Sequence, residues 1–403
     1  MKLALTVNGP GESSGWVRPV LSRLYDLDPT LDAHIFCVPD DYATGAEAQT
    51  LRAWFPQARV YEPREYVRFA LGQSLDGVPD HVDLVQYFGG DLMHAARLQR
   101  RLGGKLATFK FSRPRYARRT TLACAVDERN AGELRAWGLP QEAVHVVGNP
   151  AIDAAFDESL RGAADDPPDG GIVILPGSRS YEVEQLIPFF FTMAVKIARE
   201  QSDLPITLAI SPFTSLDAVA QAIAQGGDER MFSEKGELVQ DGTQVTLVSQ
   251  DHKTRVPVVR NAMRAAARAR IAVTIPGTKV IELAALGVPT LSITPLNIPD
   301  KITINGALTY VDRIPFFGKK IKAAAVLTVA KRFPFFTQPN IDANEELGRE
   351  LRGTLTPGRV ARITLDLLRD EPWQLMISQR LRELYLGHRG AAARMATLMK
   401  GEA

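Results

Sequence analysis

The segment from Ile172 to Glu184 carries side chains suited to binding a phosphate group. Its sequence is Ile-Val-Ile-Leu-Pro-Gly-Ser-Arg-Ser-Tyr-Glu-Val-Glu, an apolar strand that ends in a Pro-Gly turn before a helical pattern. Backbone N–H groups at the start of such a helix have no partner inside it and attract anions. Ser178 adds a hydroxyl, and Arg179 adds a planar set of donors that matches phosphate oxygens. The pattern predicts a phosphate site at this turn; the alternative is an ordinary turn with a serine cap.

A second strand, turn and helix with the same outline runs from Ile271 to Pro289. Gly277 and Thr278 fall at the start of its helix, and Glu282 falls one turn further on. A carboxylate there is close enough to accept hydrogen bonds from ribose hydroxyls. The alternative is a Thr-x-x-x-Glu helix start that resembles a capping box, and the spacing by itself favours this alternative.

Asp91 is well placed to act as a general base. It follows an apolar strand and the Gly89-Gly90 turn, so we expect it at the carboxyl end of a parallel sheet, where ligands bind. His94 shares its helix face and could assist it. An N-cap for the helix that begins at Leu92 explains Asp91 equally well.

The segment Gly11-Glu-Ser-Ser-Gly15 fits the Gly-x-Ser-x-Gly pattern of a nucleophile elbow, which would make Ser13 the nucleophile of a hydrolase. The elbow normally follows a strand deep in the sheet order, whereas this segment follows the first strand. No downstream Asp and His pair stands out. Labelling by a fluorophosphonate probe would support this alternative.

Short apolar runs alternate with helical patterns along most of the chain. In the first part we expect strands at Leu3–Val7, His34–Val38, Ala58–Tyr61, Val82–Tyr87, Lys105–Phe111, Leu122–Val126 and Val144–Val147. After a linker at Ala163–Gly171, a second set follows at Ile172–Leu175, Ile206–Ile210, Val245–Val248, Ile271–Ile275 and Thr290–Ile293. This alternation predicts parallel sheets with helices on both faces. Pro188 predicts that the helix after Arg179 breaks or begins there.

Several segments, in the same order, resemble motifs of the lipid-A-disaccharide synthases. The most specific is Leu175-Pro-Gly-Ser-Arg179 with Glu182-Val-Glu184; the others are Gly11-Glu-Ser-Ser-Gly15, Val147-Gly-Asn-Pro-Ala-Ile-Asp153, Pro276-Gly-Thr-Lys-Val-Ile-Glu282 and Gln338-Pro-Asn340. The resemblance spans nearly the whole chain. It implies the GT-B fold, a UDP-sugar donor in the C-terminal domain, inverting transfer without a metal, and an acceptor site in an N-terminal domain that faces a membrane.

The resemblance also assigns residues to these sites. The donor-binding set is Gly177, Ser178, Arg179, Glu182, Gly277, Thr278 and Glu282. An N-terminal glycine loop contains Gly11, Glu12, Ser13 and Gly15, and Asn340 belongs to a late motif. As catalytic residues we expect Asp91 and His94. A base would take the proton of the acceptor hydroxyl, while Arg179 and a helix N-terminus would stabilise the charge of the leaving UDP.

Three departures from the family pattern lie in the acceptor-side domain. Trp16 stands where the family usually has Asp, and Gly89–His94 only loosely matches its Asp-x-x-Asp-Phe-Asn segment. Phe111–Arg119 replaces its aromatic Ser-x-x-Trp-Ala-Trp loop. The resemblance therefore defines the donor site better than the acceptor site. A relative of the family that glycosylates a different lipid is an alternative.

The predicted fold class is α/β, a GT-B arrangement of two doubly wound Rossmann-like domains that face a cleft, with C-terminal helices. We place the acceptor-side domain at 1–165, the nucleotide-sugar-binding domain at 166–365, and helices that pack back toward the N-terminal domain at 366–403. A UDP-sugar epimerase uses the same two-domain frame and is the main alternative. Its product is another UDP-sugar and not a glycoside, so a product assay separates the two enzymes.

The composition argues against other classes. The 403 residues carry a formal net charge of +2, which gives no global attraction to nucleic acid. The basic helix at Arg260–Arg270 has no interleaved aromatic residues, so we expect a solvated face and no nucleic-acid partner. The 6 histidines show no metal-ligand spacing, and we expect no metal and no cofactor. Cys37 and Cys124 are expected to be buried free thiols.

The segment Arg313–Phe336 predicts contact with an anionic membrane surface. Phenylalanines flank both ends of an apolar centre, which is bracketed by Lys319, Lys320, Lys322, Lys331 and Arg332. Such a helix is too short to span about 30 Å of hydrocarbon, and the alternative to an interfacial anchor is a partly buried helix. No secretory signal and no run of about 18 apolar residues occurs. We therefore expect a cytoplasmic protein, peripheral on the inner face of the cytoplasmic membrane.

Overall fold

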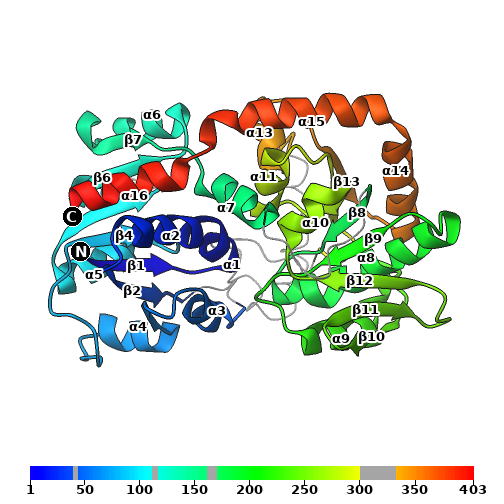
Figure 1. Cartoon of the computed structure of the whole chain (residues 1–403), viewed down its shortest axis with the longest axis horizontal. Helices are drawn as coiled ribbons and strands as arrows, with labels where there is room; N and C mark the ends of the chain where they lie inside the picture. Colours follow the sequence, from blue (N-terminus) through cyan, green and yellow to red (C-terminus); the bar gives the residue numbers. More distant parts are fainter. Residues whose placement is uncertain (40–43, 111–116, 161–169, 300–332) are drawn as a thin grey trace, which may run out of the picture. The chain divides into compact units, whose positions relative to one another are not determined.

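The chain forms two compact units in a computed structural model that describes residues 1–39, 44–110, 117–160, 170–299 and 333–403 (Figure 1). Unit 1 combines Met1–Asp157 with Tyr385–Ala403, and unit 2 is Glu158–Leu384. Each unit has its own sheet and its own core. Most of the segment predicted to contact a membrane, up to residue 332, lies outside the described residues, as does 111–116 of the loop that departs from the family pattern.

Unit 1 contains a seven-stranded sheet in which every pair of neighbours is parallel. From one edge to the other the strands are β3(Arg59–Tyr61), β2(Asp32–Cys37), β1(Lys2–Val7), β4(Leu84–Tyr87), β5(Lys105–Phe109), β6(Thr120–Ala125) and β7(Val144–Val146). The chain builds outward from β1 in one direction and then restarts at β4 in the other. The carboxyl ends of β1 and β4 therefore form the switch point, where ligands bind in such sheets.

Helices cover both faces of this sheet: α2(Arg18–Leu27), α3(Glu47–Trp54), α4(Pro63–Ala70), α5(Leu92–Leu102), α6(Glu128–Ala136), α7(Pro150–Ser159) and α16(Ala391–Glu402). One core cluster contains side chains of α2 and α16, and another contains side chains of α4 and α5. Helix α16 packs beside α2 and β6, which Figure 1 shows in red against blue and cyan. Its Met395 and Met399 are 0% exposed. The last helix of the chain thus completes the core of the unit that contains its first strand.

The predicted glycine loop after β1 is helical. The helix α1(Pro10–Glu12) leads into a π-helical turn at Ser13–Val17, which continues into α2. Gly9 keeps an extended backbone and Pro10 takes the first helical position, where its missing N–H removes no hydrogen bond. The expectation of a glycine loop here was wrong because Pro10 starts a helix directly after Gly9.

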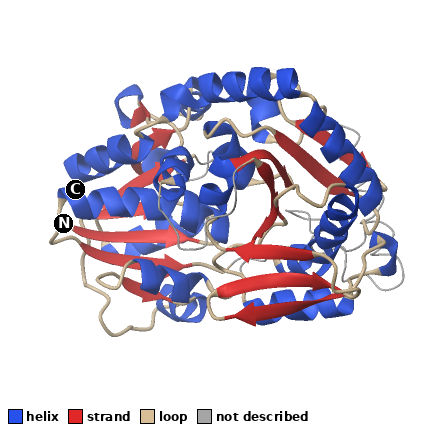
Figure 2. Ribbon diagram, turned by 45° about the vertical axis from the view of Figure 1, so that its right-hand side comes forward, coloured by secondary structure: helices blue, strands red, loops and turns tan. Residues whose placement is uncertain are grey.

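Unit 2 contains an eight-stranded mixed sheet (Figure 2). Its order is β10(Gly236–Asp241), β11(Gln244–Ser249), β12(Arg255–Val259), β9(Ile206–Ala209), β8(Gly171–Leu175), β13(Ala269–Thr274), β14(Thr290–Pro295) and β15(Arg349–Gly353). From β12 to β15 all pairs are parallel, whereas β10–β11 and β11–β12 are antiparallel. The departure from an all-parallel sheet has a local cause, because only Gly242 and Thr243 join β10 to β11, and a two-residue loop joins antiparallel strands.

The helices of unit 2 are α8(Ser180–Glu200), α9(Leu216–Gln225), α10(Ala262–Arg268), α11(Thr278–Ala285), α13(Gln338–Ala343), α14(Pro357–Arg369) and α15(Glu371–Tyr385). Helix α8 runs without a break through Pro188, so the predicted interruption there was wrong. A proline inside a helix costs about 3 kcal/mol. Phe189, Phe190 and Phe191 are each 0% exposed, and each fully buried phenylalanine contributes about 1.5–3 kcal/mol. Core packing therefore outweighs the proline.

The structure tests the expectations for the cysteines and for membrane-spanning helices. Cys37 and Cys124 are free and buried as predicted, and burial raises the pKa of each thiol to about 12. Among the helices in the described ranges, none is both long and apolar enough to cross a membrane.

A buried carboxylate holds the start of β15 to the start of α13. The side chain of Glu350 is 5% exposed and accepts hydrogen bonds from the Thr337 amide at 2.9 Å, the Thr337 hydroxyl at 2.7 Å, the Asn340 amide group at 2.9 Å and the Arg352 guanidinium at 2.7 Å. We expect Glu350→Gln to lower the stability of unit 2 by about 1–3 kcal/mol, because a neutral amide loses the charge-assisted bonds and turns donors toward donors. Hydrogen exchange of the β15 amides measures the loss.

The loss in Glu350→Gln should depend on pH. Burial alone would raise the pKa of Glu350, but the hydrogen bonds from Thr337, Arg352 and Phe336 outweigh it and hold the pKa below its usual value. Its stabilisation is therefore complete above the pKa of an unfolded glutamate and is lost as pH falls through the folded pKa. Glu200→Gln, which removes an exposed partner of Arg369, is the matched control and should change little. Equal exchange in the two variants would contradict the prediction.

Candidate functional site

The two motif turns of unit 2 lie side by side at the carboxyl edge of its sheet. Strands β8 and β13 are parallel neighbours, with Leu175 opposite Thr274, so the turns that follow them start at the same level. Gly177 has φ +104°, and a Cβ there would overlap the side chains of Glu182 and Ile275. Glycine is thus required both for the backbone conformation and for the close approach of the second turn. The strand order makes this edge the switch point of unit 2.

The start of α8 is occupied by a carboxylate from its own first turn. Oε2 of Glu182 accepts hydrogen bonds from the backbone N–H groups of Ser178 at 2.7 Å and Arg179 at 2.9 Å. Oε1 lies 3.3 Å from Nη1 of Arg179, whose side chain is 49% exposed. The N–H groups predicted to bind phosphate are therefore engaged by an internal anion, while the guanidinium still faces solvent.

The second turn leads into α11. Gly277 has an extended backbone and precedes Thr278, the first helical residue, and the helix has no side-chain cap. Glu282 is 1% exposed, and its Oε2 lies 2.6 Å from Nζ of Lys279. The arrangement places a helix N-terminus, a hydroxyl and a buried carboxylate beside the Arg179 turn, a combination that suits a phosphate with an attached sugar.

Arg260 is a candidate that the sequence analysis did not assign to this edge. It follows the last residue of β12, and its Nη1 lies 3.5 Å from the carbonyl oxygens of Ser211 and Pro212, which follow β9. Burial lowers the pKa of this guanidinium below its usual value. The position after a strand end was the available signal, but β12 was not predicted as a strand.

In unit 1, residues after β1 and β4 meet around the glycine pair that precedes Asp91. A Cβ at Gly89 would overlap the Asn8 side-chain oxygen and lie 3.1 Å from Cγ of Glu12. A Cβ at Gly90 would lie 3.6 Å from Cδ2 of His94. Glu12 and His94, far apart in the sequence, therefore flank one turn at the switch point of this sheet.

Asp91 is exposed and is the N-cap of α5, the structural alternative considered for it. Oδ1 accepts a hydrogen bond from the Met93 amide at 2.8 Å. Oδ2 makes no hydrogen bond with any residue in the described ranges. Capping uses one carboxylate oxygen, and the second is left to accept a proton.

His94 contacts a tyrosine from the neighbouring helix. Its Nδ1 lies 2.7 Å from the hydroxyl of Tyr66 on α4. Burial lowers the pKa of His94, the charge of Asp91 raises it, and the charge of Arg97 lowers it. The net direction is downward, so the ring is neutral near neutral pH.

Two predicted site residues, Ser13 and Asn340, are buried and form hydrogen bonds inside their own units. Ser13 is 0% exposed and its hydroxyl donates to the Gly9 carbonyl at 2.9 Å inside the helical segment, which is not the exposed geometry of a nucleophile elbow. Asn340 is 0% exposed and bonds to the Gly348 carbonyl at 2.8 Å, the Leu347 amide at 2.9 Å and the carboxylate of Glu350 at 2.9 Å. Gly11 lies in α1, and Gly15 is buried in the π-helical turn.

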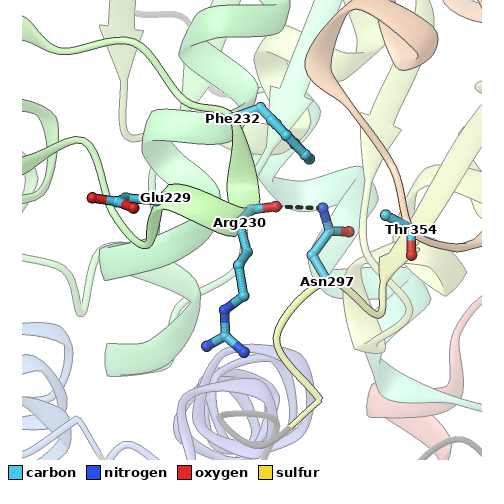
Figure 3. A pocket seen from close by; sticks show the side chains of 5 residues that line it. All are labelled: Glu229, Arg230, Phe232, Asn297 and Thr354. Carbon is cyan, nitrogen blue, oxygen red and sulfur yellow. Dashed lines mark hydrogen bonds between the residues drawn. The ribbon is translucent and has the colours of Figure 1, made fainter.

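A pocket of 390 Å³ lies where residues that follow β14 and β15 meet the turn at Glu229–Met231 (Figure 3). It is lined by Glu229, Arg230, Phe232, Asn297 and Thr354. The Asn297 amide donates to the carbonyls of Arg230 at 2.7 Å and Leu355 at 2.8 Å, so it joins the walls together. Within the described ranges, no group of three or more acidic, histidine or cysteine side chains could hold a metal ion.

The sequence matches no protein-family model and no curated protein, but the structure resembles solved ones. S. aureus MnaA, solved with UDP, has a TM-score of 0.59 at 14% identity over 98% of this chain and 95% of that one. A putative UDP-N-acetylglucosamine 2-epimerase from Listeria monocytogenes has a TM-score of 0.56 at 14% identity over 99% and 96%. CalG4, the calicheamicin glycosyltransferase, has a TM-score of 0.52 at 16% identity over 99% and 98%.

At these identities the likeness concerns the fold. Nearly the whole chain, and therefore both α/β units, takes part in it. The predicted fold class is therefore confirmed: this chain has a GT-B-like α/β fold.

Proposed function

We propose that the chain is a glycosyltransferase that moves a sugar from a UDP-sugar to a lipid-linked acceptor, with inversion and without a metal. The main support is the meeting of the Arg179 turn and the α11 start at the switch point of unit 2. Solved structures with this fold include MnaA with UDP. The motifs that resemble those of lipid-A-disaccharide synthases point to the same class, with the acceptor lipid open.

The proposed reaction divides the roles between the units. The acceptor oxygen forms a bond to the anomeric carbon while the bond from that carbon to the UDP oxygen breaks. Asp91 of unit 1 takes the proton of the acceptor hydroxyl, and the charge gained by UDP is stabilised by Arg179 and the start of α11 in unit 2. Glu282 binds the ribose hydroxyls.

A UDP-sugar epimerase is the second candidate, because the solved structures of this fold include a putative UDP-N-acetylglucosamine 2-epimerase. A product assay separates the two. The protein is incubated with radiolabelled UDP-sugars, with and without extracted membrane lipid. Label that moves into the lipid phase with release of UDP supports transfer. Label that stays in a new UDP-sugar, independent of lipid, identifies an epimerase.

We also propose that the protein associates with an anionic membrane surface. The support is the basic and aromatic sequence of Arg313–Phe336, and a lipid acceptor would require such contact. We expect co-sedimentation with anionic vesicles that weakens as salt rises, because salt screens the attraction between lysines and headgroups. Equal recovery with neutral and anionic vesicles would rule out an electrostatic contact.

A further inference from the structure

Among the described residues, the hydroxyl of Tyr66 has one hydrogen-bond partner, His94. Tyr66 is 1% exposed, and its Oη lies 2.7 Å from Nδ1 of His94. Oη has no other hydrogen-bond partner in the described ranges, and burial raises the pKa of Tyr66 to about 12, so the phenol stays protonated. A buried hydroxyl needs an acceptor for its proton, and here the acceptor is Nδ1.

This bond selects one tautomer of His94. If Nδ1 carried a proton, it would donate to Oη, and the phenol proton would be left buried without an acceptor. When Oη–H donates to Nδ1, both groups are satisfied, and the neutral imidazole carries its proton on Nε2. Nε2 has no hydrogen-bond partner in the described part of the chain, and the His94 residue is half-buried.

The groups around the ring keep it neutral. Burial is the largest influence on the pKa of His94 and lowers it, Asp91 on the same helix raises it, and Arg97 lowers it. Tyr66 is the group that faces it from α4. Beside the Gly89-Gly90 turn lie Asn8 and the carboxylate-bearing side chain of Glu12.

We propose that Tyr66 is a positioning residue that holds His94 as a neutral hydrogen-bond donor through Nε2–H. His94 then donates to an oxygen of the substrate at the carboxyl edge of unit 1, while proton acceptance falls to a carboxylate such as Asp91. The role toward substrate rests on the proposed function, whereas the tautomer follows from the local geometry. His94 thus orients the acceptor instead of acting as a second base.

Nitrogen-15 NMR of histidine-labelled protein tests the tautomer without any substrate, because protonated and unprotonated ring nitrogens resonate in different ranges. We expect the Nε2–H form of His94 to dominate at neutral pH. Tyr66→Phe should lower the ratio of Nε2–H to Nδ1–H by about two- to tenfold, the value of one net hydrogen bond. A dominant Nδ1–H form, or a ratio that Tyr66→Phe leaves unchanged, would overturn the proposal.

A second tyrosine–histidine pair in unit 1 supplies the matched control. Nδ1 of His34 lies 3.0 Å from the Tyr61 hydroxyl, and its Nε2 lies 3.1 Å from Oδ1 of Asp32. The nearby charge of Asp32 favours a proton on Nε2, so His34 provides a reference signal for the same tautomer. Tyr61→Phe should alter the His34 signal and leave His94 unchanged.

Turnover of two His94 variants shows whether His94 acts as a hydrogen-bond donor or as a base. A glutamine amide nitrogen occupies roughly the place of Nε2, and an asparagine amide nitrogen that of Nδ1. We expect His94→Gln to keep turnover within about tenfold of the original, and His94→Asn to lose roughly 10²–10³-fold, the effect of a missing fixed donor. Equal loss in both variants would exclude donation from Nε2. Calorimetry with UDP is run on the same samples: failure of the original protein to bind UDP refutes the proposed function and leaves the NMR result standing.

Discussion

Asp91→Asn is expected to lower turnover by roughly 10²–10⁴-fold while UDP binding is retained, the usual effect of removing a general base. The substitution is mild for the fold, because asparagine caps a helix about as well as aspartate does. The bond from the Met93 amide to Oδ1, at 2.8 Å, can therefore be kept. What is lost is the charge and basicity of the second oxygen. Initial rates of UDP release at saturating donor, together with calorimetry of UDP, measure the two quantities.

Asp127→Asn is the matched control for this experiment. Asp127 is the N-cap of α6 in the same unit, and its Oδ1 accepts from the Asn130 amide at 2.6 Å. Asp127→Asn makes the same chemical change at the same helix position. Turnover should stay within about twofold, because asparagine caps a helix about as well as aspartate does. If Asp91→Asn also turned over normally, Asp91 would be only a cap. Glu12, which lies beside the Gly89 turn, would then be the next carboxylate to replace.

Arg179→Ala is expected to weaken UDP binding by about 1.5–3 kcal/mol, the value of a hydrogen bond to a charged group. Glu182 already accepts hydrogen bonds from the N–H groups of Ser178 and Arg179 at the start of α8. The Arg179 side chain is 49% exposed, and its planar guanidinium matches the geometry of phosphate oxygens. Calorimetry with excess chelator measures the affinity and tests independence of metal.

Arg199→Ala is the corresponding control. Arg199 lies in the last turn of the same helix with a side chain that is 47% exposed, and it pairs with Asp251 at 3.1 Å. Its removal should leave UDP affinity unchanged because it is at the other end of α8 from the motif turn. Unchanged affinity in Arg179→Ala, or binding that disappears with the chelator, would contradict the donor site proposed here.

Much of the secondary structure could be predicted from local sequence. Helix α5 begins at Leu92, as expected, because Asp91 caps its start, and Gly103 follows its end. The strands β1, β8 and β13 were recognisable because strands covered on both faces are continuous apolar runs. The positions of the motif turns follow directly, since a turn after a parallel strand lies at the carboxyl edge of its sheet.

Other features depended on contacts between distant residues. Pro188 lies inside α8 because the phenylalanines after it are buried in the core of unit 2, and local propensity cannot report that burial. Strand β15 was missed because it contains three charged residues. Arg352 is paired with Glu350 at 2.7 Å, and Arg349 is paired with Glu346 at 2.9 Å. Polar composition indicates a loop until those partners are known.

The sequence by itself determined the α/β class, the strand ends and the residues able to bind phosphate or accept a proton, because periodicity and turn chemistry are local properties. Only the tertiary structure decided which of these residues meet. It brought Glu12 and His94 to one turn, placed Tyr66 against Nδ1 of His94, and turned Glu182 onto the amides of Ser178 and Arg179. These contacts join segments through buried area and hydrogen bonds across the fold, which sequence spacing does not specify.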